Sequence, residues 1–190
     1  MSKVFKIIYF YDYLLSLALV IFIWPLLLLI YLVIFFEIGS PLFIQKRVGK
    51  NKKIFNLFKF RTMKIGTPSL ASHKINSSYL TNTGKLLRKF KLDELPQLIN
   101  VLRGEMSLVG PRPNLPIQKE LIGERDKYNL YLFKPGITGL SQINNIDMSN
   151  PKLLAESDFK MMKNMNQIDY LKYLFRTLIG KGSGDAISHK

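Results

Sequence analysis

The sequence contains no cysteine and only two histidines among its 190 residues. Without thiols the chain cannot build a disulfide scaffold, a thiolate zinc site, an iron–sulfur cluster or a cysteine nucleophile. His73 and His189 are too few for a histidine-rich metal site or a pair of catalytic imidazoles, and His189 lies in a tail that contains Gly and Ser. Any reaction catalysed by this chain is therefore expected to use carboxylates, hydroxyls and cationic side chains.

The common nucleotide-binding loops are missing as well. Gly84-Lys85 lacks the upstream glycine and the following hydroxyl of a P-loop. Neither a G-x-G-x-x-G loop nor a G-x-S-x-G nucleophile elbow occurs. If the chain handles phosphate, it does so without these loops.

Acidic residues are scarce and unevenly placed. The chain has 28 Lys and Arg against 13 Asp and Glu, a net charge of +15, so its partners are expected to be anionic. No acid occurs between Glu37 and the adjacent pair Asp93-Glu94, although that interval holds 13 of the basic residues. With 47% hydrophobic residues the chain is too apolar for a disordered basic tail, and its length predicts one compact domain.

A long apolar segment lies near the N-terminus. Residues 14–36 carry no charge; as a helix they would extend roughly 35 Å at ~1.5 Å per residue, enough for a bilayer core of ~30 Å. The run is too long for a cleavable signal peptide and no cleavage site follows it. We therefore predict that residues 1–36 insert into a membrane.

Pro25 lies in the middle of this segment and leaves two topologies open. A proline there removes the hydrogen bond to the Ile21 carbonyl and kinks or breaks the helix. Both flanks are basic, with Lys3 and Lys6 before the segment and a denser group after it. A spanning helix and a helix–break–helix that re-enters one leaflet both fit, and either places the rest of the chain in the cytoplasm.

The remainder is expected to form a predominantly helical α/β domain over 37–180, followed by a disordered tail over 181–190. Alternating residues predict a small β-hairpin over 42–63 about a turn at 49–51, and Pro135-Gly136 fits a type II turn. A polar loop is expected over 64–82. Helices are expected over 84–91, 93–104 and 119–132, with one or two amphipathic helices over 152–178.

The helix expected over 93–104 carries the acidic pair. Its predicted apolar face consists of Leu95, Leu98, Ile99 and Leu102, and Asp93 is predicted to cap its N-terminus. Acids in a first helical turn commonly just complement the helix dipole, and that interpretation stays open. Alternatively, a carboxylate kept ionised by the helix end and by nearby cations is available as a nucleophile, and its neighbour is a natural Mg²⁺ ligand.

Three basic residues are candidates for binding phosphate. Arg112 lies between Pro111 and Pro113, which restrict the backbone around its guanidinium. Lys59 and Arg61 are expected on one strand face. A rigid loop with a solvated arginine and a charged edge strand are the plainer alternatives. Binding to nucleic acid is disfavoured, because the basic stretch adjoins a membrane segment and suits anionic headgroups.

Several motifs together resemble the bacterial sugar transferases, the monotopic phosphoglycosyl transferases. The run KLDELPQLINVLRGEMSLVGPRP over 91–113 resembles the family signature. Further matches are QKRVG at 45–49, KFRTM at 59–63 and KPGITGLSQ at 134–142, in the family's order and spacing. The resemblance extends to about residue 178 and is to the small form of the family.

This resemblance implies transfer of a sugar-1-phosphate from a UDP-sugar to a polyprenol phosphate, with release of UMP. It implies that Asp93 is the nucleophile and forms a covalent phosphosugar intermediate, that Glu94 with Asp93 binds Mg²⁺, and that the Pro111–Pro113 motif contacts the nucleotide phosphates. It also implies substrate-binding roles for Lys59, Arg61, Arg88 and Gln142. Finally, it favours a re-entrant helix broken at Pro25, interfacial amphipathic helices, and a catalytic domain on the cytoplasmic face of the bacterial inner membrane.

The chain departs from the family pattern at two places. Many members carry Gly-Arg where this chain has Asn145-Ile146, and arginines often found before Gly84 are absent from 79–83. Both differences concern substrate contacts, so the sugar and the glycan it would initiate remain open, as does a homodimer. The alternative function is a non-enzymatic membrane module that binds anionic lipid or nucleic acid through residues 46–91, which predicts indifference to the carboxylates.

Overall fold

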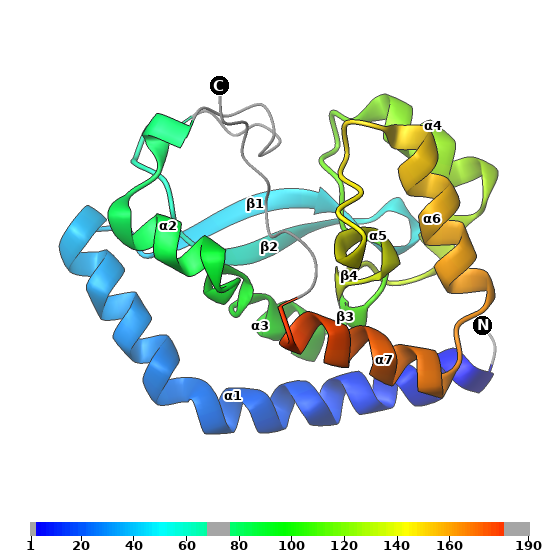
Figure 1. The fold of residues 1–190 in the computed structure, drawn as a ribbon, viewed down its shortest axis with the longest axis horizontal. Helices are drawn as coiled ribbons and strands as arrows, with labels where there is room; N and C mark the ends of the chain where they lie inside the picture. The colour runs from blue at the N-terminus through cyan, green and yellow to red at the C-terminus, as the bar shows by residue number, and fades with distance from the viewer. Residues whose placement is uncertain (1–2, 68–76, 181–190) are drawn as a thin grey trace.

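The computed structural model describes residues 3–67 and 77–180. The tail expected over 181–190 and part of the loop expected over 64–82 lie outside these residues. A long N-terminal helix runs beneath a β-hairpin and a group of shorter helices (Figure 1). The elements are α1 (Lys3–Ile38), β1 (Leu42–Val48), η1 (Lys50–Lys52), β2 (Ile54–Phe60), η3 (Ser77–Tyr79), α2 (Asn82–Lys89), η4 (Leu92–Glu94), α3 (Gln97–Leu102), β3 (Ser107–Val109), α4 (Lys119–Lys127), η5 (Leu130–Leu132), β4 (Gly136–Thr138), α5 (Leu140–Ile143), α6 (Pro151–Lys163) and α7 (Gln167–Leu178), where η marks a 3-10 helix.

Helix α1 is continuous through Pro25, so the expected break is not an interruption of the helix. Figure 1 shows α1 changing direction sharply along its length, and Pro25 is the proline inside it, where a backbone hydrogen bond is missing. The residues on either side of Pro25 pack against different parts of the protein: Ile8 belongs to the main core, whereas Ile34 packs with Phe60 and Leu87. A bend at the middle of α1 therefore lets one helix cover two hydrophobic surfaces.

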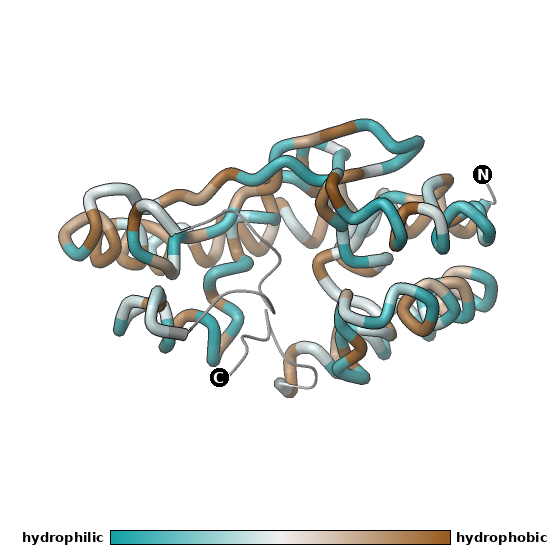
Figure 2. Tube along the Cα trace, turned by 90° about the horizontal axis from the view of Figure 1, so that it is seen from above, coloured by the Kyte–Doolittle hydropathy of each residue, from teal (hydrophilic) through white to brown (hydrophobic). Residues whose placement is uncertain are grey.

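The length and apolar character of α1 suffice to cross a membrane. Figure 2 shows hydrophobic residues along the end of the helix that leads into the hairpin. One acid is nevertheless buried in it: Asp12 Oδ1 accepts hydrogen bonds from Leu108 N (3.0 Å) and from the Tyr170 hydroxyl (2.8 Å). Asp12 thus joins α1 to both β3 and α7.

The predicted hairpin is confirmed. Strands β1 and β2 pair antiparallel from Leu42↔Phe60 to Val48↔Ile54. The turn contains two residues with positive φ, Asn51 at 52° and Lys52 at 58°. Phe55 and Leu57 of β2 are buried and Ile54 is exposed, as expected for a strand with one face on the core.

The helix expected over 93–104 begins at Gln97 instead, and the prediction that Asp93 caps it is wrong. Asp93 lies in the preceding 3-10 turn η4, and Pro96 occupies the N-cap position of α3. A cap at Asp93 would need a backbone N–H two or three residues into the helix, and Pro96 has none to offer.

The buried face of α3 also differs from the predicted one. Ile99 is 42% exposed, whereas Asn100 is fully buried. Asn100 accepts a hydrogen bond from Phe58 N (3.1 Å) and donates to the Asn56 carbonyl oxygen (2.7 Å), both in β2. These hydrogen bonds hold α3 against the hairpin with Asn100, and not Ile99, on its buried face. A hydrophobic pattern cannot predict this orientation.

The predicted type II turn at Pro135-Gly136 is replaced by a strand. Gly136 belongs to β4, which pairs in parallel with β3, and it is not among the glycines with positive φ. Because Gly136 has no side chain, its backbone can lie against that of Gly110; a Cβ on Gly136 would lie 2.0 Å from Gly110 N. Gly136 N donates instead to the Pro111 carbonyl oxygen (2.9 Å).

Residues 152–178 form two helices, α6 and α7, as one of the two alternatives predicted. Both pack against the main core, through residues such as Met161 and Tyr170. Helix α7 also presents an exposed apolar stripe of Ile168, Leu171, Phe175 and Leu178. In Figure 1 this helix lies beside the first part of α1, the two elements being in contact.

Candidate active site

The structure brings Lys59, Glu94 and Arg112 together from three separate segments. Glu94 Oε1 lies 3.1 Å from Lys59 Nζ and 2.7 Å from Arg112 Nη2. Glu94 is only 8% exposed, so the two cations offset the cost of removing its charge from water. Strand β2, turn η4 and the loop after β3 thus contribute to one charged centre.

Asp93 lies directly before Glu94 in η4 and is 3% exposed. The turn begins after Lys91, whose left-handed backbone (φ 56°) redirects the chain from α2 into η4. Burial lowers the pKa of Lys91 below its ordinary value of 10.5, Glu94 opposes that change, and the charge of Arg112 adds to it. The carboxylate pair therefore lies close to three cationic side chains.

The loop that carries Arg112 is held by its backbone carbonyls. Four consecutive carbonyl oxygens, from Pro111 to Asn114, accept hydrogen bonds in turn from Gly136 N (2.9 Å), Arg125 Nη1 (2.8 Å), Arg47 Nη1 (2.9 Å) and Val48 N (2.9 Å). The donors come from β4, α4 and β1. Two prolines alone predicted a rigid loop, and these contacts explain how its position is set.

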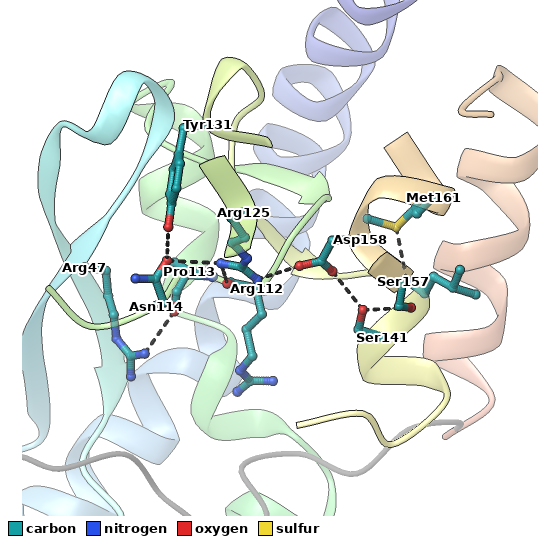
Figure 3. A network of polar contacts seen from close by, with 11 residues as sticks. Arg47, Arg112, Pro113, Asn114, Arg125, Tyr131, Ser141, Ser157, Asp158 and Met161 are labelled. Atoms are coloured by element: carbon teal, nitrogen blue, oxygen red, sulfur yellow. Dashed lines mark hydrogen bonds and ion pairs between the residues drawn. The ribbon is translucent and has the colours of Figure 1, made fainter. Parts of the chain in front are cut away.

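Arg125 is the centre of a buried polar network (Figure 3). Its Nη2 lies 2.6 Å from Asp158 Oδ2, and the two side chains are 2% and 0% exposed. Asp158 Oδ1 accepts a hydrogen bond from Ser141 Oγ (2.8 Å), while Asn114 Oδ1 accepts from Arg125 Nη1 (3.1 Å) and from the Tyr131 hydroxyl (2.9 Å). Burial raises the pKa of Asp158, and the adjacent guanidinium opposes that rise.

Sequence reasoning missed this network, although a signal was present. Asp158 lies on the apolar face of α6, with Leu154, Ala155, Met161 and Met162 at three and four residues' distance on either side. A carboxylate on such a face needs a buried cationic or hydrogen-bonding partner. The pattern does not say which residue provides it, because Arg125 is 33 positions away.

A cavity of about 370 Å³ adjoins the charged centre. Its polar lining includes Glu94, Arg112 and Gln142, and its apolar lining comes from α1, from the end of α7 and from the segments of η4, α3, β3 and β4. The apolar residues include Leu19, Ile23, Leu26 and Leu178. The cavity therefore joins a cationic site to the long hydrophobic helix.

Gln142 is the residue in this cavity that most directly indicates a ligand. It is 9% exposed, and neither its Oε1 nor its Nε2 has a hydrogen-bond partner in the described part of the chain. Leaving a buried amide unpaired costs about 1–3 kcal/mol. A bound molecule with polar groups would satisfy it.

Of the predicted substrate-binding residues, Arg112 and Gln142 belong to the lining of this cavity, whereas Lys59, Arg61, Arg88, Pro111 and Pro113 do not. Arg61 follows β2, and its Nε donates to the Ser40 carbonyl oxygen (2.8 Å) at the junction of α1 and β1. Arg88 Nε donates to Thr62 Oγ1 (2.8 Å). Their roles in substrate binding stay predictions.

The carboxylate pair offers the donor chemistry that Mg²⁺ requires. Among the described residues no group of three or more His, Cys, Asp or Glu could hold a metal ion. Mg²⁺ does not need such a cage, since it commonly takes one or two carboxylates and completes its shell with phosphate oxygens and water. Asp93 and Glu94 fit that requirement when a diphosphate is present.

Comparison with known proteins shows the family. Residues 2–181 match the family described as bacterial sugar transferase, and the chain belongs to it. It is 37% identical over 183 residues to an uncharacterized sugar transferase of Haemophilus influenzae, covering 86% of this chain and 38% of that protein.

Two relatives have more specific names. The undecaprenyl-phosphate glucose phosphotransferase of Komagataeibacter xylinus is 41% identical over 157 residues, 78% of this chain and 29% of its own length. The UDP-glucose:undecaprenyl-phosphate glucose-1-phosphate transferase of Caulobacter vibrioides is 37% identical over 147 residues, 71% and 55% of the two chains. The matched part of this chain thus covers less than two thirds of the length of each of these three relatives.

Proposed function

We propose that this protein transfers a sugar-1-phosphate from a UDP-sugar to a polyprenol phosphate such as undecaprenyl phosphate, the first membrane step in building a glycoconjugate. The observation that carries the proposal is Glu94, which follows Asp93 in the chain, pairs with Lys59 and Arg112, and lines with Arg112 a cavity that is otherwise largely apolar. The names of the Komagataeibacter and Caulobacter relatives support the same reaction class.

In the proposed first step an Asp93 carboxylate oxygen attacks the β-phosphorus of the UDP-sugar. The bond from that phosphorus to the bridging oxygen breaks, UMP leaves with the oxygen, and the sugar phosphate stays on Asp93. In the second step a polyprenol phosphate oxygen attacks the same phosphorus. The bond to Asp93 breaks, which regenerates the carboxylate and yields the polyprenol diphosphate sugar.

Charge neutralisation is the main requirement of both steps, since an anion must approach an anion. Arg112 and Lys59 lie at the carboxylate pair, and Lys91 lies beside it. When bound by Asp93 and Glu94, Mg²⁺ would supply further neutralisation of the diphosphate. The buried amide of Gln142 would hydrogen-bond a polar group of the substrate in the same cavity.

We assign the apolar wall of the cavity to the end of the polyprenol chain nearest its phosphate. Leu19, Ile23 and Leu26 of α1 line this wall, so a lipid that lies along α1 reaches the charged centre without crossing water. Helix α1 would enter the inner membrane from the cytoplasmic face and return at its bend. The apolar stripe of α7 would then lie at the membrane surface, with the catalytic domain in the cytoplasm.

The test is a single-turnover assay. Purified protein with a UDP-sugar and Mg²⁺, but without polyprenol phosphate, is expected to release up to one UMP per enzyme and to gain a sugar-phosphate mass on Asp93. Asp93→Asn is expected to abolish both signals, whereas Lys172→Gln on the exposed side of α7 should release UMP as the wild type does. A panel of UDP-sugars then identifies the donor.

Normal turnover by Asp93→Asn would contradict the proposed mechanism. Absence of UMP release with every sugar in the panel, together with salt-sensitive binding of vesicles or nucleic acid that ignores Asp93, would favour the non-enzymatic alternative.

A further inference from the structure

Arg112 has two contacts that face in opposite directions. Its guanidinium pairs with Glu94 (2.7 Å), while its carbonyl oxygen accepts a hydrogen bond from Arg125 Nη1 (2.8 Å). Figure 3 shows the Arg112 side chain extending away from Arg125 while its backbone lies against it. A displacement of the carbonyl therefore moves the guanidinium relative to the carboxylate pair.

The same buried ion pair is also bonded to a second segment that lines the cavity. Asp158, the partner of Arg125, accepts a hydrogen bond from Ser141 Oγ (2.8 Å). Ser141 directly precedes Gln142, the buried amide that lines the cavity with Arg112. One ion pair is thus bonded to both segments that hold these polar side chains.

We propose that Arg125 and Asp158 are positioning residues, which set the position of Arg112 relative to Gln142 in the lining of the substrate cavity. The proposal rests on the proposed function. It assigns a role to two residues that touch neither the carboxylate pair nor, by the cavity lining, the substrate.

Stability alone is a poor explanation of this ion pair. Taking two charges out of water is costly, and well-packed hydrophobic residues often replace a buried ion pair without loss of stability. A planar guanidinium, in contrast, places its donors in fixed directions, here toward Arg112, Asn114 and Asp158 together. Neither a lysine nor a hydrophobic residue can reproduce that geometry.

The first experiment compares a hydrophobic pair, Arg125→Met with Asp158→Leu, and the single variant Arg125→Lys with the wild type. Both are expected to fold, with an unchanged circular dichroism spectrum, yet to lose about 30- to 100-fold in the rate of UMP release, since a small misplacement of a binding group has effects of that size. Tyr170→Phe, which removes a buried hydrogen bond to Asp12 elsewhere in the core, controls for a general loss of packing.

A double-mutant cycle separates positioning from a merely structural role. If Arg125 and Asp158 act through Arg112, then Asp158→Asn costs little further activity in an Arg112→Ala background. A structural role predicts that the two losses multiply, because they are independent. Full activity of the folded hydrophobic pair, or multiplying losses, would overturn the proposal.

Hydrogen exchange provides a readout that needs no substrate. Amides in residues 110–115 are expected to exchange about 10-fold faster in Asp158→Asn, with those of α2 unchanged. Unchanged exchange at 110–115 overturns the proposal even if the wild type releases UMP. Conversely, faster exchange in a protein that turns over no UDP-sugar would retain the loop-holding role and reject only the proposed function.

Discussion

Single residues in this protein are defined by the charges that surround them. Glu94 can stay buried because the positive charges of Lys59 and Arg112 balance its negative charge. Lys91 lies close enough for the charges of Glu94 and Arg112 to change its pKa. The protonation equilibrium of Lys91 therefore depends on Glu94 and Arg112. This dependence can be measured at Lys91.

We expect the apparent KM for the UDP-sugar to rise with pH, starting at an alkaline pH below the ordinary pKa of a lysine. Burial lowers the pKa of Lys91 from 10.5, so the folded protein loses this cation at a pH where the unfolded chain still holds its proton. Across that interval the unfolded chain binds more protons, and the group makes the free energy of unfolding rise with pH while phosphate binding weakens. A steady-state pH profile of KM measures the effect.

The control for this pH effect is Lys91→Arg, which keeps its charge throughout the same range. The alkaline rise in KM should flatten in this variant. An identical profile in wild type and Lys91→Arg would show that another group titrates.

At the scale of elements, the β3–β4 pair sets the position of the Arg112 loop. Gly136 of β4 lies against Gly110, the residue that follows β3, and the two backbones are too close for a side chain between them. Gly136→Ala should therefore lower the free energy of unfolding by about 3 kcal/mol through overpacking, and should reduce UMP release because the loop shifts. Chemical denaturation followed by fluorescence measures the first effect.

Gly123→Ala is the matched control. Gly123 lies within α4, where an added Cβ meets nothing within 4 Å. Alanine has the better helix propensity, so this variant should gain about 1 kcal/mol. Equal stabilities for the two alanine variants would contradict the close approach of Gly110 and Gly136.

The hairpin, α2 and the α6–α7 pair were predictable because their residues repeat with the period of the element. The helix expected over 119–132 ends at Lys127, and residues 130–132 form the separate turn η5 after Asn129, whose φ is 53°. The register of α3 was not, because Asn100 anchors it through hydrogen bonds that a hydrophobic pattern cannot reveal. Of the candidate site, the sequence named Glu94, Lys59 and Arg112 as separate candidates, and the structure brings the three side chains together. Arg125 and Asp158 belong to no local pattern, since only the tertiary fold brings them together.

At the scale of the whole molecule, the bend in α1 supports a re-entrant topology with both chain ends on one side of the membrane. Because the sequence contains no cysteine, a single introduced cysteine is the only thiol that a maleimide can label. With a membrane-impermeant maleimide, Lys3→Cys and Lys172→Cys should both be protected in intact spheroplasts and both react in inverted vesicles. Reaction of Lys3→Cys in intact spheroplasts would demonstrate a spanning helix instead.

The hydrogen bond between Asp12 and Tyr170 has a consequence for the order in which the protein is made. The two residues are separated by 158 positions, which a ribosome adding roughly 5–20 residues per second needs about 8–32 seconds to translate. During that time the carboxylate of Asp12 has neither Tyr170 nor, at first, Leu108 to donate to it. Helix α1 therefore completes its native contacts only after α7 has been made, and a nascent chain arrested before Tyr170 should hold α1 less firmly than the full chain does.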